Sequence, residues 1–194
     1  MNEQEIIKLV HSCADDSRAA LDDAATRLAP ALAGAALLVV SAIRSGAGVL
    51  ACGNGGSAAD SQHMAAELVG RFLLEREAFP AVALTTDTSV LTSLANDYGY
   101  HAVFERQVRA LGRAGGVLVA MSTSGNSKNV LLAMDAAREM NMKIIALTGA
   151  GGGKMKERAD VLIDAASDHT PRIQEVHGFA VHVLCDIAER TLAG

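Results

Sequence analysis

Short, continuous apolar runs recur along most of the chain, and helix-length segments separate them. Such runs are typical of strands that are buried on both faces, as in a parallel sheet. We therefore predict five strands, at about residues 48–52, 81–84, 116–121, 143–147 and 161–163. Helices are predicted between and after these strands, at about residues 58–74, 89–111, 127–141, 152–158 and 171–192. This alternation predicts an α/β fold, a doubly wound αβα sandwich with a five-stranded parallel sheet.

The first 45 residues contain no strand-like run, and their apolar residues recur at helical spacing instead. We predict one long N-terminal helix that is broken at Pro30, and a second helix from about Leu32 to Ile43. No linker or low-complexity tract follows these helices. The chain is therefore predicted to form a single domain over residues 1–194, with a helical arm at 1–45 and an α/β core at 46–194 that includes the last helix.

The two N-terminal helices carry more apolar side chains than one flank of a five-stranded sheet can cover. An uncovered apolar patch of this kind usually marks an interface between protein chains. We therefore predict a symmetric oligomer in which this arm takes part through Ile6, Ile7, Leu9, Val10, Leu21, Leu28, Leu32, Leu37, Leu38, Val39 and Val40. The last helix is also apolar around its polar residues, which suits a helix that lies between subunits.

Composition and charge exclude several classes of protein. Of the 194 residues, 50% are hydrophobic and 20% are charged, so the chain can form a core without disulfides or a structural metal. The formal net charge is -5, and there are no Trp and only 2 Tyr to stack on bases. Binding to nucleic acid is therefore not expected as a main function.

The sequence also carries signals about its compartment. The longest uncharged stretch, Leu28 to Ile43, has 16 residues, whereas a membrane-spanning helix needs about 20. The N-terminal segment is acidic and polar, unlike a secretory signal. The cysteines, at positions 13, 52 and 185, are odd in number and lie far apart. We therefore expect a cytoplasmic protein with no membrane contact and no disulfides.

Three of the predicted strands run directly into loops of small residues that open helices, at 52–57, 121–127 and 147–151. In an open parallel sheet such loops meet at the carboxyl edge of the strands, where ligands bind. The second loop offers four hydroxyl groups, from Ser122, Thr123, Ser124 and Ser127, at the start of a helix. Hydroxyls and backbone N–H groups at a helix start favour a phosphate monoester. The alternative is that the cluster only caps the helix and forms a turn.

The other two loops do not match the known nucleotide-binding motifs. The spacing Gly53-x-Gly55-x-x-Ala58 fits the dinucleotide fingerprint, but the nearest acidic candidate at the end of the next strand, Asp87, lies too far along the chain. In the third loop, Thr148 replaces the first glycine of a P-loop, and Met155 stands where that motif has Ser or Thr. A nucleotide site is therefore disfavoured.

Candidate acid–base and metal-binding residues lie on two predicted helices. His63 and Glu67 are four residues apart, so their side chains lie one turn apart on one helix face. On the last helix, His182 can converge on one ligand with either Gln174 or Glu175, and the spacing alone does not choose between them. Either a metal or a substrate could bridge these groups. The alternative is that the histidines are ordinary core or surface residues.

Taken together and in order, the motifs of this chain resemble those of the bacterial phosphoheptose isomerases, which have the sugar isomerase (SIS) fold. The resemblance covers nearly the whole chain and rests on Cys52-Gly-Asn-Gly-Gly-Ser57, His63-Met-Ala-Ala-Glu67, Gly70-Arg71, Asn96-Asp97, Ser122-Thr-Ser-Gly-Asn-Ser127, Leu147-Thr-Gly149, Thr170-Pro-Arg-Ile-Gln-Glu175 and His182. It implies a single SIS domain that converts sedoheptulose 7-phosphate to D-glycero-D-manno-heptose 7-phosphate. That reaction is the first step toward the ADP-heptose of the lipopolysaccharide core. The resemblance further implies a cytoplasmic homotetramer with shared active sites and one zinc ion per subunit.

The resemblance also implies roles for individual residues. Glu67 and His182 would be the catalytic acid–base pair, and zinc would be bound by His63, Glu67, Gln174 and His182. The sugar phosphate would contact Glu67, Gln174, Asn54, Gly55, Gly56, Asn96, Asp97, Ser122, Thr123, Ser124 and Ser127. His63 and Glu67 of one chain are expected to meet His182 of another. Some relatives have Asp where Pro171 stands here, so any catalytic role of that Asp cannot be transferred.

Two alternatives of a different class share the fold. The DnaA-initiator-associating protein resembles this chain in its loops but lacks the counterparts of Glu67 and His182, and both residues are present here. Regulatory SIS domains that bind sugar phosphates would not need this pair either. The presence of Glu67 and His182 therefore favours the isomerase.

Overall fold

Five parallel strands form the centre of the fold, in the order β2-β1-β3-β4-β5. The computed structural model describes residues 1–193. The strands are β1 (Val49–Cys52), β2 (Ala81–Ala83), β3 (Val117–Ser122), β4 (Lys143–Thr148) and β5 (Val161–Asp164). The strand order reverses between β1 and β3, whose registers align Val49 with Val117. Such a switch point opens a crevice at the carboxyl ends of the strands, where ligands bind in α/β folds.

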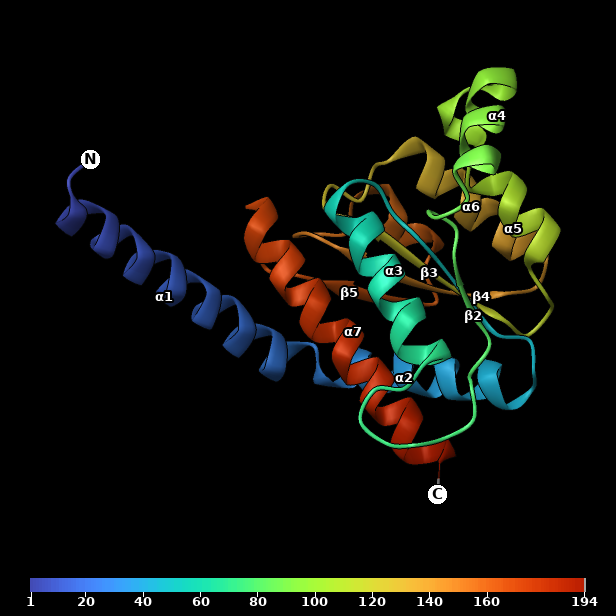
Figure 1. Cartoon of the computed structure of the whole chain (residues 1–194), viewed down its shortest axis with the longest axis horizontal. Helices are drawn as coiled ribbons and strands as arrows, with labels where there is room; N and C mark the ends of the chain where they lie inside the picture. The colour runs from blue at the N-terminus through green and yellow to red at the C-terminus, as the bar shows by residue number, and fades with distance from the viewer. Residues whose placement is uncertain (194) are drawn as a thin grey trace.

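Helices cover both faces of the sheet (Figure 1). One face carries α2 (Ala29–Arg44), α3 (Gly56–Val69) and α7 (Thr170–Leu192), and α1 (Glu3–Arg27) packs against α7. The opposite face carries α5 (Glu105–Leu111) and α6 (Lys128–Glu139), with α4 (Thr88–Tyr98) and the 3-10 helices η1 (Tyr100–Ala102) and η2 (Gly153–Arg158) beside them. The doubly wound αβα architecture with a five-stranded parallel sheet is therefore confirmed.

Alternate residues of the central strands point into the two halves of the core. In β3, Val117, Val119 and Met121 pack toward α2 and α7, whereas Leu118 and Ala120 pack toward α6. All six residues of β3 are buried, as its continuous apolar sequence predicts. Strand β2 differs because it lies at the edge of the sheet, and its Val82 is 44% exposed.

Two predicted helices end earlier than expected. The helix predicted at 89–111 is divided into α4, η1 and α5, because Gly99 has a φ of 89° and leaves the helical conformation. Helix α3 ends at Val69 rather than near residue 74, and residues 70–80 form an irregular loop before β2. Both breaks lie outside the strands, so they leave the sheet topology unchanged.

The N-terminal arm consists of two helices with a sharp bend between them. Helix α1 begins with a capping box in which Asn2 and Glu5 bond each other's backbone N–H groups. Pro30 cannot continue α1 because its ring clashes with the preceding turn, and it sits instead in the first turn of α2. Arg27 secures the bend through an ion pair with Asp164, at 2.9 Å.

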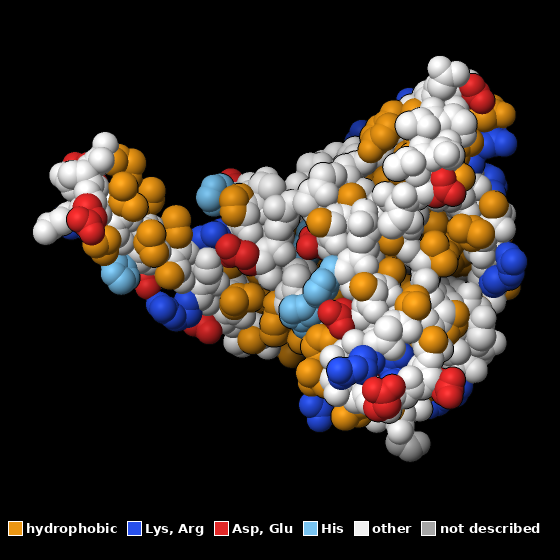
Figure 2. Space-filling model, in the orientation of Figure 1, with side chains coloured by type: hydrophobic (Ala, Val, Ile, Leu, Met, Phe, Trp, Pro, Cys, Tyr) orange, Lys and Arg blue, Asp and Glu red, His pale blue; other side chains and the backbone are white. Residues whose placement is uncertain are grey.

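The outer part of α1 stands away from the rest of the chain (Figure 1). Its apolar residues Ile6, Ile7, Leu9 and Val10 are exposed, and Figure 2 shows apolar side chains along the arm. The large apolar residues of α2 are mostly buried in the core, although Leu37 is exposed. The prediction that Leu28, Leu32, Val39 and Val40 belong to an uncovered apolar patch is therefore wrong, because they pack in this chain's own core. Within residues 1–193, no single helix is long and apolar enough to cross a membrane; α1 and α2 reach that length only as a pair bent by 70°.

Candidate active site

The loops that follow β1 and β3 meet at the switch point of the sheet. Asn54 in the first loop and Asn129 near the start of α6 exchange two side-chain hydrogen bonds, of 3.0 and 2.8 Å. The hydroxyl of Tyr100 donates a third bond to Asn54, at 3.0 Å. These bonds fix the first loop against the second, so both contribute to one site.

Glycines let the first loop approach its neighbours closely. A Cβ on Gly53 would lie 2.7 Å from the carbonyl oxygen of Ser57, which the tight turn into α3 does not permit. A Cβ on Gly56, the first residue of α3, would overlap the side-chain amide of Gln174 on α7. The glycines at these positions therefore serve close packing.

The second loop brings three of its hydroxyl groups together. Ser122 lies 2.9 Å from Ser127 and 3.4 Å from Ser124, measured between the hydroxyl oxygens. Ser127 stands at the N-cap of α6, but its side chain makes no capping bond to the helix backbone. Its hydroxyl, which bonds that of Ser122, therefore faces the start of α6, where the helix dipole attracts an anion.

A cavity of about 220 Å³ lies between these loops and the start of α7. Polar groups dominate its lining, which consists of Asn54, Ser57, Met121, Ser122, Thr123, Ser127, Thr170 and Gln174. A larger hollow of about 480 Å³ lies beside β2, but it is lined mainly by apolar side chains and includes neither hydroxyl-bearing loop. The smaller cavity is therefore the better candidate for a phosphate site.

A second cluster of polar groups lies further along α3 and α7. The Nε2 atoms of His63 and His182 are 2.9 Å apart, and the same atom of His63 lies 3.5 Å from a carboxylate oxygen of Glu67. The ring of Phe72 lies 5.6 Å from that of His182. The His63 side chain is 48% exposed and that of Glu67 is 22% exposed, and Figure 2 shows histidines gathered on this face. The cluster is thus open to a ligand.

Comparisons with known proteins agree on one family. The sequence pattern of the SIS domain matches residues 13–149. The phosphoheptose isomerase of Rhodospirillum rubrum is 57% identical over 164 residues, covering 84% of this chain and 87% of that protein. The chain belongs to the phosphoheptose isomerase family of SIS domain proteins.

Solved structures of the family have the same fold. The phosphoheptose isomerase of Neisseria gonorrhoeae matches this chain with a TM-score of 0.91 at 46% identity, covering 95% of this chain and 99% of that one. A phosphoheptose isomerase from Francisella tularensis also gives a TM-score of 0.91, at 39% identity, covering 95% and 98% of the two chains.

In this member of the family, His182 meets His63 within one chain, and the expectation that they come from different subunits is wrong for this pair. Helices α3 and α7 each follow a parallel strand on the same face of the sheet, and they pack side by side. This packing puts Gly56 against Gln174 near the helix starts and His63 against His182 two turns later. The cluster therefore forms without a second chain.

The structure also distinguishes Gln174 from Glu175, which the spacing left open. Gln174 points toward Gly56 and lines the cavity, whereas Glu175 turns aside and bonds Arg172 at 2.6 Å. Gln174 precedes His182 by eight residues, which corresponds to about 12 Å along the helix. The amide thus lies at the hydroxyl-lined end of the site, and its role as a zinc ligand stays a prediction.

Asn96 and Asp97 lie apart from the cavity lining. Both are exposed on α4, where the amide of Asn96 donates to the carboxylate of Asp97 at 2.8 Å. Their predicted contact with the sugar stays a prediction. The nearby residue that does reach the first loop is Tyr100, which sequence reasoning missed because its position depends on the break at Gly99.

Sequence reasoning also missed Asp60, which lies one turn before His63 on the same face of α3. One of its carboxylate oxygens is buried without a hydrogen-bond partner, and burial raises the pKa of this group, against a smaller opposing effect of His63. The spacing of three residues from His63 could have signalled it. His177, by contrast, is buried under β4, where its Nε2 atom bonds the carbonyl of Thr148.

Proposed function

We propose that this protein is a phosphoheptose isomerase that converts sedoheptulose 7-phosphate to D-glycero-D-manno-heptose 7-phosphate, the first step toward ADP-heptose. The observation that carries the proposal is the spacing between the hydroxyl-lined cavity and the histidine pair. By helical rise, Gly56 and His63 lie about 10 Å apart, and Gln174 and His182 about 12 Å apart. In the substrate, six carbon–carbon bonds of about 1.5 Å separate the phosphate-bearing C7 from C1, so an extended chain spans about 8 Å. The phosphate ester adds roughly 3 Å, so a heptulose phosphate reaches from one end of the site to the other.

The phosphate end would be held by hydroxyls and helix starts. Ser122, Ser124 and Ser127 already cluster, and Thr123 lines the same cavity. The N-termini of α3 and α6 both lie here, so two helix dipoles favour an anion. The site therefore binds a dianion without a lysine or arginine in its lining.

The reacting end would be served by the acid–base pair. Moving the carbonyl from C2 to C1 requires a base that takes a proton from C1 and returns it at C2, and groups that exchange protons with the two oxygens. Imidazole accepts and releases protons near neutral pH, so His182 is assigned to carbon and Glu67 to the oxygens. Such steps contribute about 10² to 10⁴-fold in rate. Positioning of the substrate and electrostatic stabilisation of the transition state supply the rest of the rate enhancement.

The two imidazoles act as one proton-sharing unit. Because their Nε2 atoms face each other at 2.9 Å, one ring donates and the other accepts. At least one nitrogen lone pair is therefore directed into the cluster. A substrate oxygen that enters between the rings takes over this hydrogen bond and leaves His182 free to act on carbon.

We also propose that the cluster binds zinc. Zinc prefers imidazole nitrogens and carboxylate oxygens as ligands. The Nε2 atom of His63 lies within 3.5 Å of both the Nε2 atom of His182 and a carboxylate oxygen of Glu67. Two nitrogens on a tetrahedral zinc would stand about 3.4 Å apart, so His63 and His182 need to separate by only about 0.5 Å. No three His, Cys, Asp or Glu side chains among residues 1–193 already form a complete metal centre. His63, Glu67 and His182 would hold the ion, and bound zinc would polarise the substrate carbonyl. Gln174, which the resemblance gives as the fourth ligand, lines the hydroxyl-bearing cavity in this chain, so the fourth position would be left to water or substrate.

The same proposal includes a homotetramer in the cytoplasm. Support for the assembly comes from the outer half of α1, whose apolar residues Ile6, Ile7, Leu9 and Val10 are exposed. A helix that carries Ile6, Leu9 and Val10 into solvent gains stability when a second copy covers it. Light scattering on the intact chain and on an Ile6→Glu/Val10→Glu variant tests this, because the variant should dissociate.

The decisive experiment is direct turnover. Purified protein is incubated with sedoheptulose 7-phosphate, and the products are separated to detect an aldoheptose phosphate. Dephosphorylated sedoheptulose is the matched control, and we expect it to react poorly because it lacks the anion. Tight binding of the heptulose phosphate without any product would instead support the regulatory alternative.

Metal analysis tests the zinc site separately from activity. Purified protein should carry close to one zinc per chain, and His63→Ala should lose it because only Glu67 and His182 would remain of the three clustered ligands. His177→Ala is unsuitable as a control because His177 is buried in the core. The matched control is the exposed His11→Ala on α1. An unchanged zinc load in His63→Ala would remove His63 from the site.

A further inference from the structure

A buried ion pair lies two turns beyond the histidine cluster, between α7 and the loop at residues 70–80. The side chains of Arg76 and Glu189 are only 3% and 1% exposed, and their Nε and carboxylate oxygen atoms are 3.1 Å apart. Glu189 also accepts backbone N–H bonds from Phe72, Leu73 and Leu74, at 2.9, 2.6 and 2.7 Å. These bonds lower the pKa of Glu189 against the opposing effect of its burial. The carboxylate is therefore ionised and fully bonded.

Arg76 connects the same pair to the end of α3. Its guanidinium donates to the backbone carbonyls of Glu67, Leu68, Gly70 and Glu77. Glu67 and Leu68 belong to the last turn of α3 and Gly70 is its C-cap, a region where helices leave carbonyls unpaired and favour a positive charge. The guanidinium also stacks on Phe79, 3.7 Å from the ring centre. Arg76 thus caps the helix that carries Glu67.

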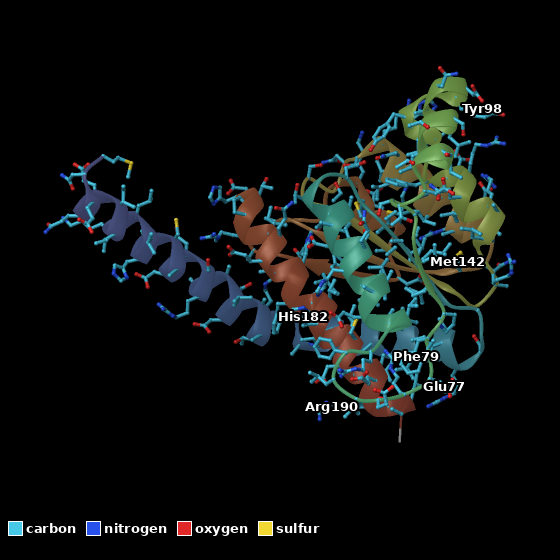
Figure 3. The ribbon with its side chains drawn as sticks, viewed as in Figure 1. Glu77, Phe79, Tyr98, Met142, His182 and Arg190 are labelled. Atoms are coloured by element: carbon cyan, nitrogen blue, oxygen red, sulfur yellow. The ribbon has the colours of Figure 1, made fainter. Side chains whose placement is uncertain are left out.

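Apart from the half-buried ring of Phe72, the first part of this loop is held mainly through its backbone. Residues 70–80 form no helix or strand, and Figure 3 shows Glu77 and Phe79 in this segment, to one side of His182. Leu73 and Leu74 are 59% and 46% exposed, so packing does not fix them. Their backbone N–H groups, with that of Phe72, are all directed at Glu189. The carboxylate is therefore what sets the path of this segment.

The path matters because it places groups in the proposed site. Phe72, held by its N–H on Glu189, puts its ring 5.6 Å from the imidazole of His182. Glu67 is held through its carbonyl by Arg76. Glu189 follows His182 by seven residues, so both lie on nearly the same face of α7. The buried pair of Arg76 and Glu189 thus bonds the backbone of Phe72, beside His182, and the backbone of Glu67.

We infer that Arg76 and Glu189 are positioning residues for proton transfer, setting the orientation of His182 through Phe72 and of Glu67 through the end of α3. The inference rests on the proposed isomerase function. A purely structural pair would also be buried and bonded, so the test must separate orientation from stability. Misplacement of a catalytic group by about 1 Å costs up to about a hundredfold in rate.

The experiment compares Glu189→Gln with Glu75→Gln, a matched control in the same loop whose side chain is 93% exposed. Steady-state kinetics with sedoheptulose 7-phosphate is measured well below the melting temperature of each variant. For Glu189→Gln we expect kcat to fall ten- to a hundredfold with KM within about threefold of wild type, because the phosphate cavity lies at the other end of α3. Glu75→Gln should keep both constants.

Phe72→Leu provides a second variant that leaves the ion pair intact, in case Glu189→Gln does not fold. It should lower kcat with little change in KM, and it should be non-additive with Glu189→Gln if both act through His182. A wild-type kcat in folded Glu189→Gln or in Phe72→Leu would overturn the inference. The inference would also be overturned if kcat fell only in proportion to the fraction of protein that is folded.

Nuclear magnetic resonance distinguishes this inference from the proposed function itself. With the two rings 5.6 Å apart, the imidazole signals of His182 should show a ring-current shift from Phe72, and this shift does not require turnover. If the wild-type protein fails to isomerise the heptulose phosphate, the proposed function fails. The positioning contact is then still tested, because Glu189→Gln should shift the His182 signals and Glu75→Gln should not.

Discussion

Replacing Gly56 with alanine should weaken substrate binding while leaving the fold intact. Gly56 begins α3, and a Cβ at this position would overlap the amide nitrogen of Gln174 and lie 2.8 Å from its Cδ. The backbone of α3 cannot retreat easily, because Gly53 and Ser57 pack tightly in the turn before it. The side chain of Gln174 must therefore rotate out of the cavity that it lines.

The expected magnitudes differ for stability and for binding. The displaced atoms are the far end of a flexible side chain, and alanine is favoured over glycine in a helix by up to about 1 kcal/mol. We therefore expect the free energy of unfolding to change by less than about 1 kcal/mol. A hydrogen bond from Gln174 to a charged ligand is worth about 1.5–3 kcal/mol. Its loss should raise KM by about ten- to a hundredfold.

The assay combines kinetics with chemical denaturation on the same samples. KM for sedoheptulose 7-phosphate and the unfolding free energy are measured for Gly56→Ala and for Gly34→Ala. Gly34 lies within α2, where a Cβ would make only an ordinary contact of 3.8 Å with Val161, so this control should keep its KM. An unchanged KM in Gly56→Ala would show that Gln174 does not contact the substrate. A loss of several kcal/mol in stability would show that α3 and α7 cannot adjust.

Three further predictions concern single residues. Glu67→Gln and His182→Gln should each lower kcat by several orders of magnitude at an unchanged melting temperature, because each removes a proton-transfer group at the surface. A variant that keeps more than a tenth of the wild-type rate would refute the role assigned to that residue. Burial lowers the pKa of His177 to about 4 from an ordinary 6.5, so the unfolded chain binds its proton first as pH falls. Stability should thus drop by about 3 kcal/mol between pH 6.5 and 4, and urea titrations should show a weaker drop in His177→Gln. Burial raises the pKa of the Cys52 and Cys185 thiols to about 12, so mass spectrometry should find both unalkylated by iodoacetamide in folded protein at pH 8.

The strands and the hydroxyl-bearing loop could be predicted because their signals are local. Continuous apolar runs such as 117–121 are compatible with few structures other than a buried strand, and a cluster of hydroxyls before a helix favours an anion. The helix at 89–111 could not be predicted correctly in the same way. Its apolar pattern continues across Gly99, and a helix can either tolerate an isolated glycine or end at it, so only the structure, with a φ of 89° at Gly99, reveals the break.

The amino-acid sequence by itself determined the α/β class, the carboxyl-edge position of the site and its family resemblance, because these depend on residue types in a fixed order. Only the tertiary structure decided which residues meet. The offset between α3 and α7 pairs His63 with His182 and Gly56 with Gln174, and a shift of one residue would move each side chain by about 1.5 Å and 100°. Arg76 and Glu189 lie 113 positions apart, and no local pattern connects them. They pair because α3, α7 and the loop at 70–80 pack on the same face of the sheet. That packing depends on the whole core and not on the sequence of α7 or of the loop alone.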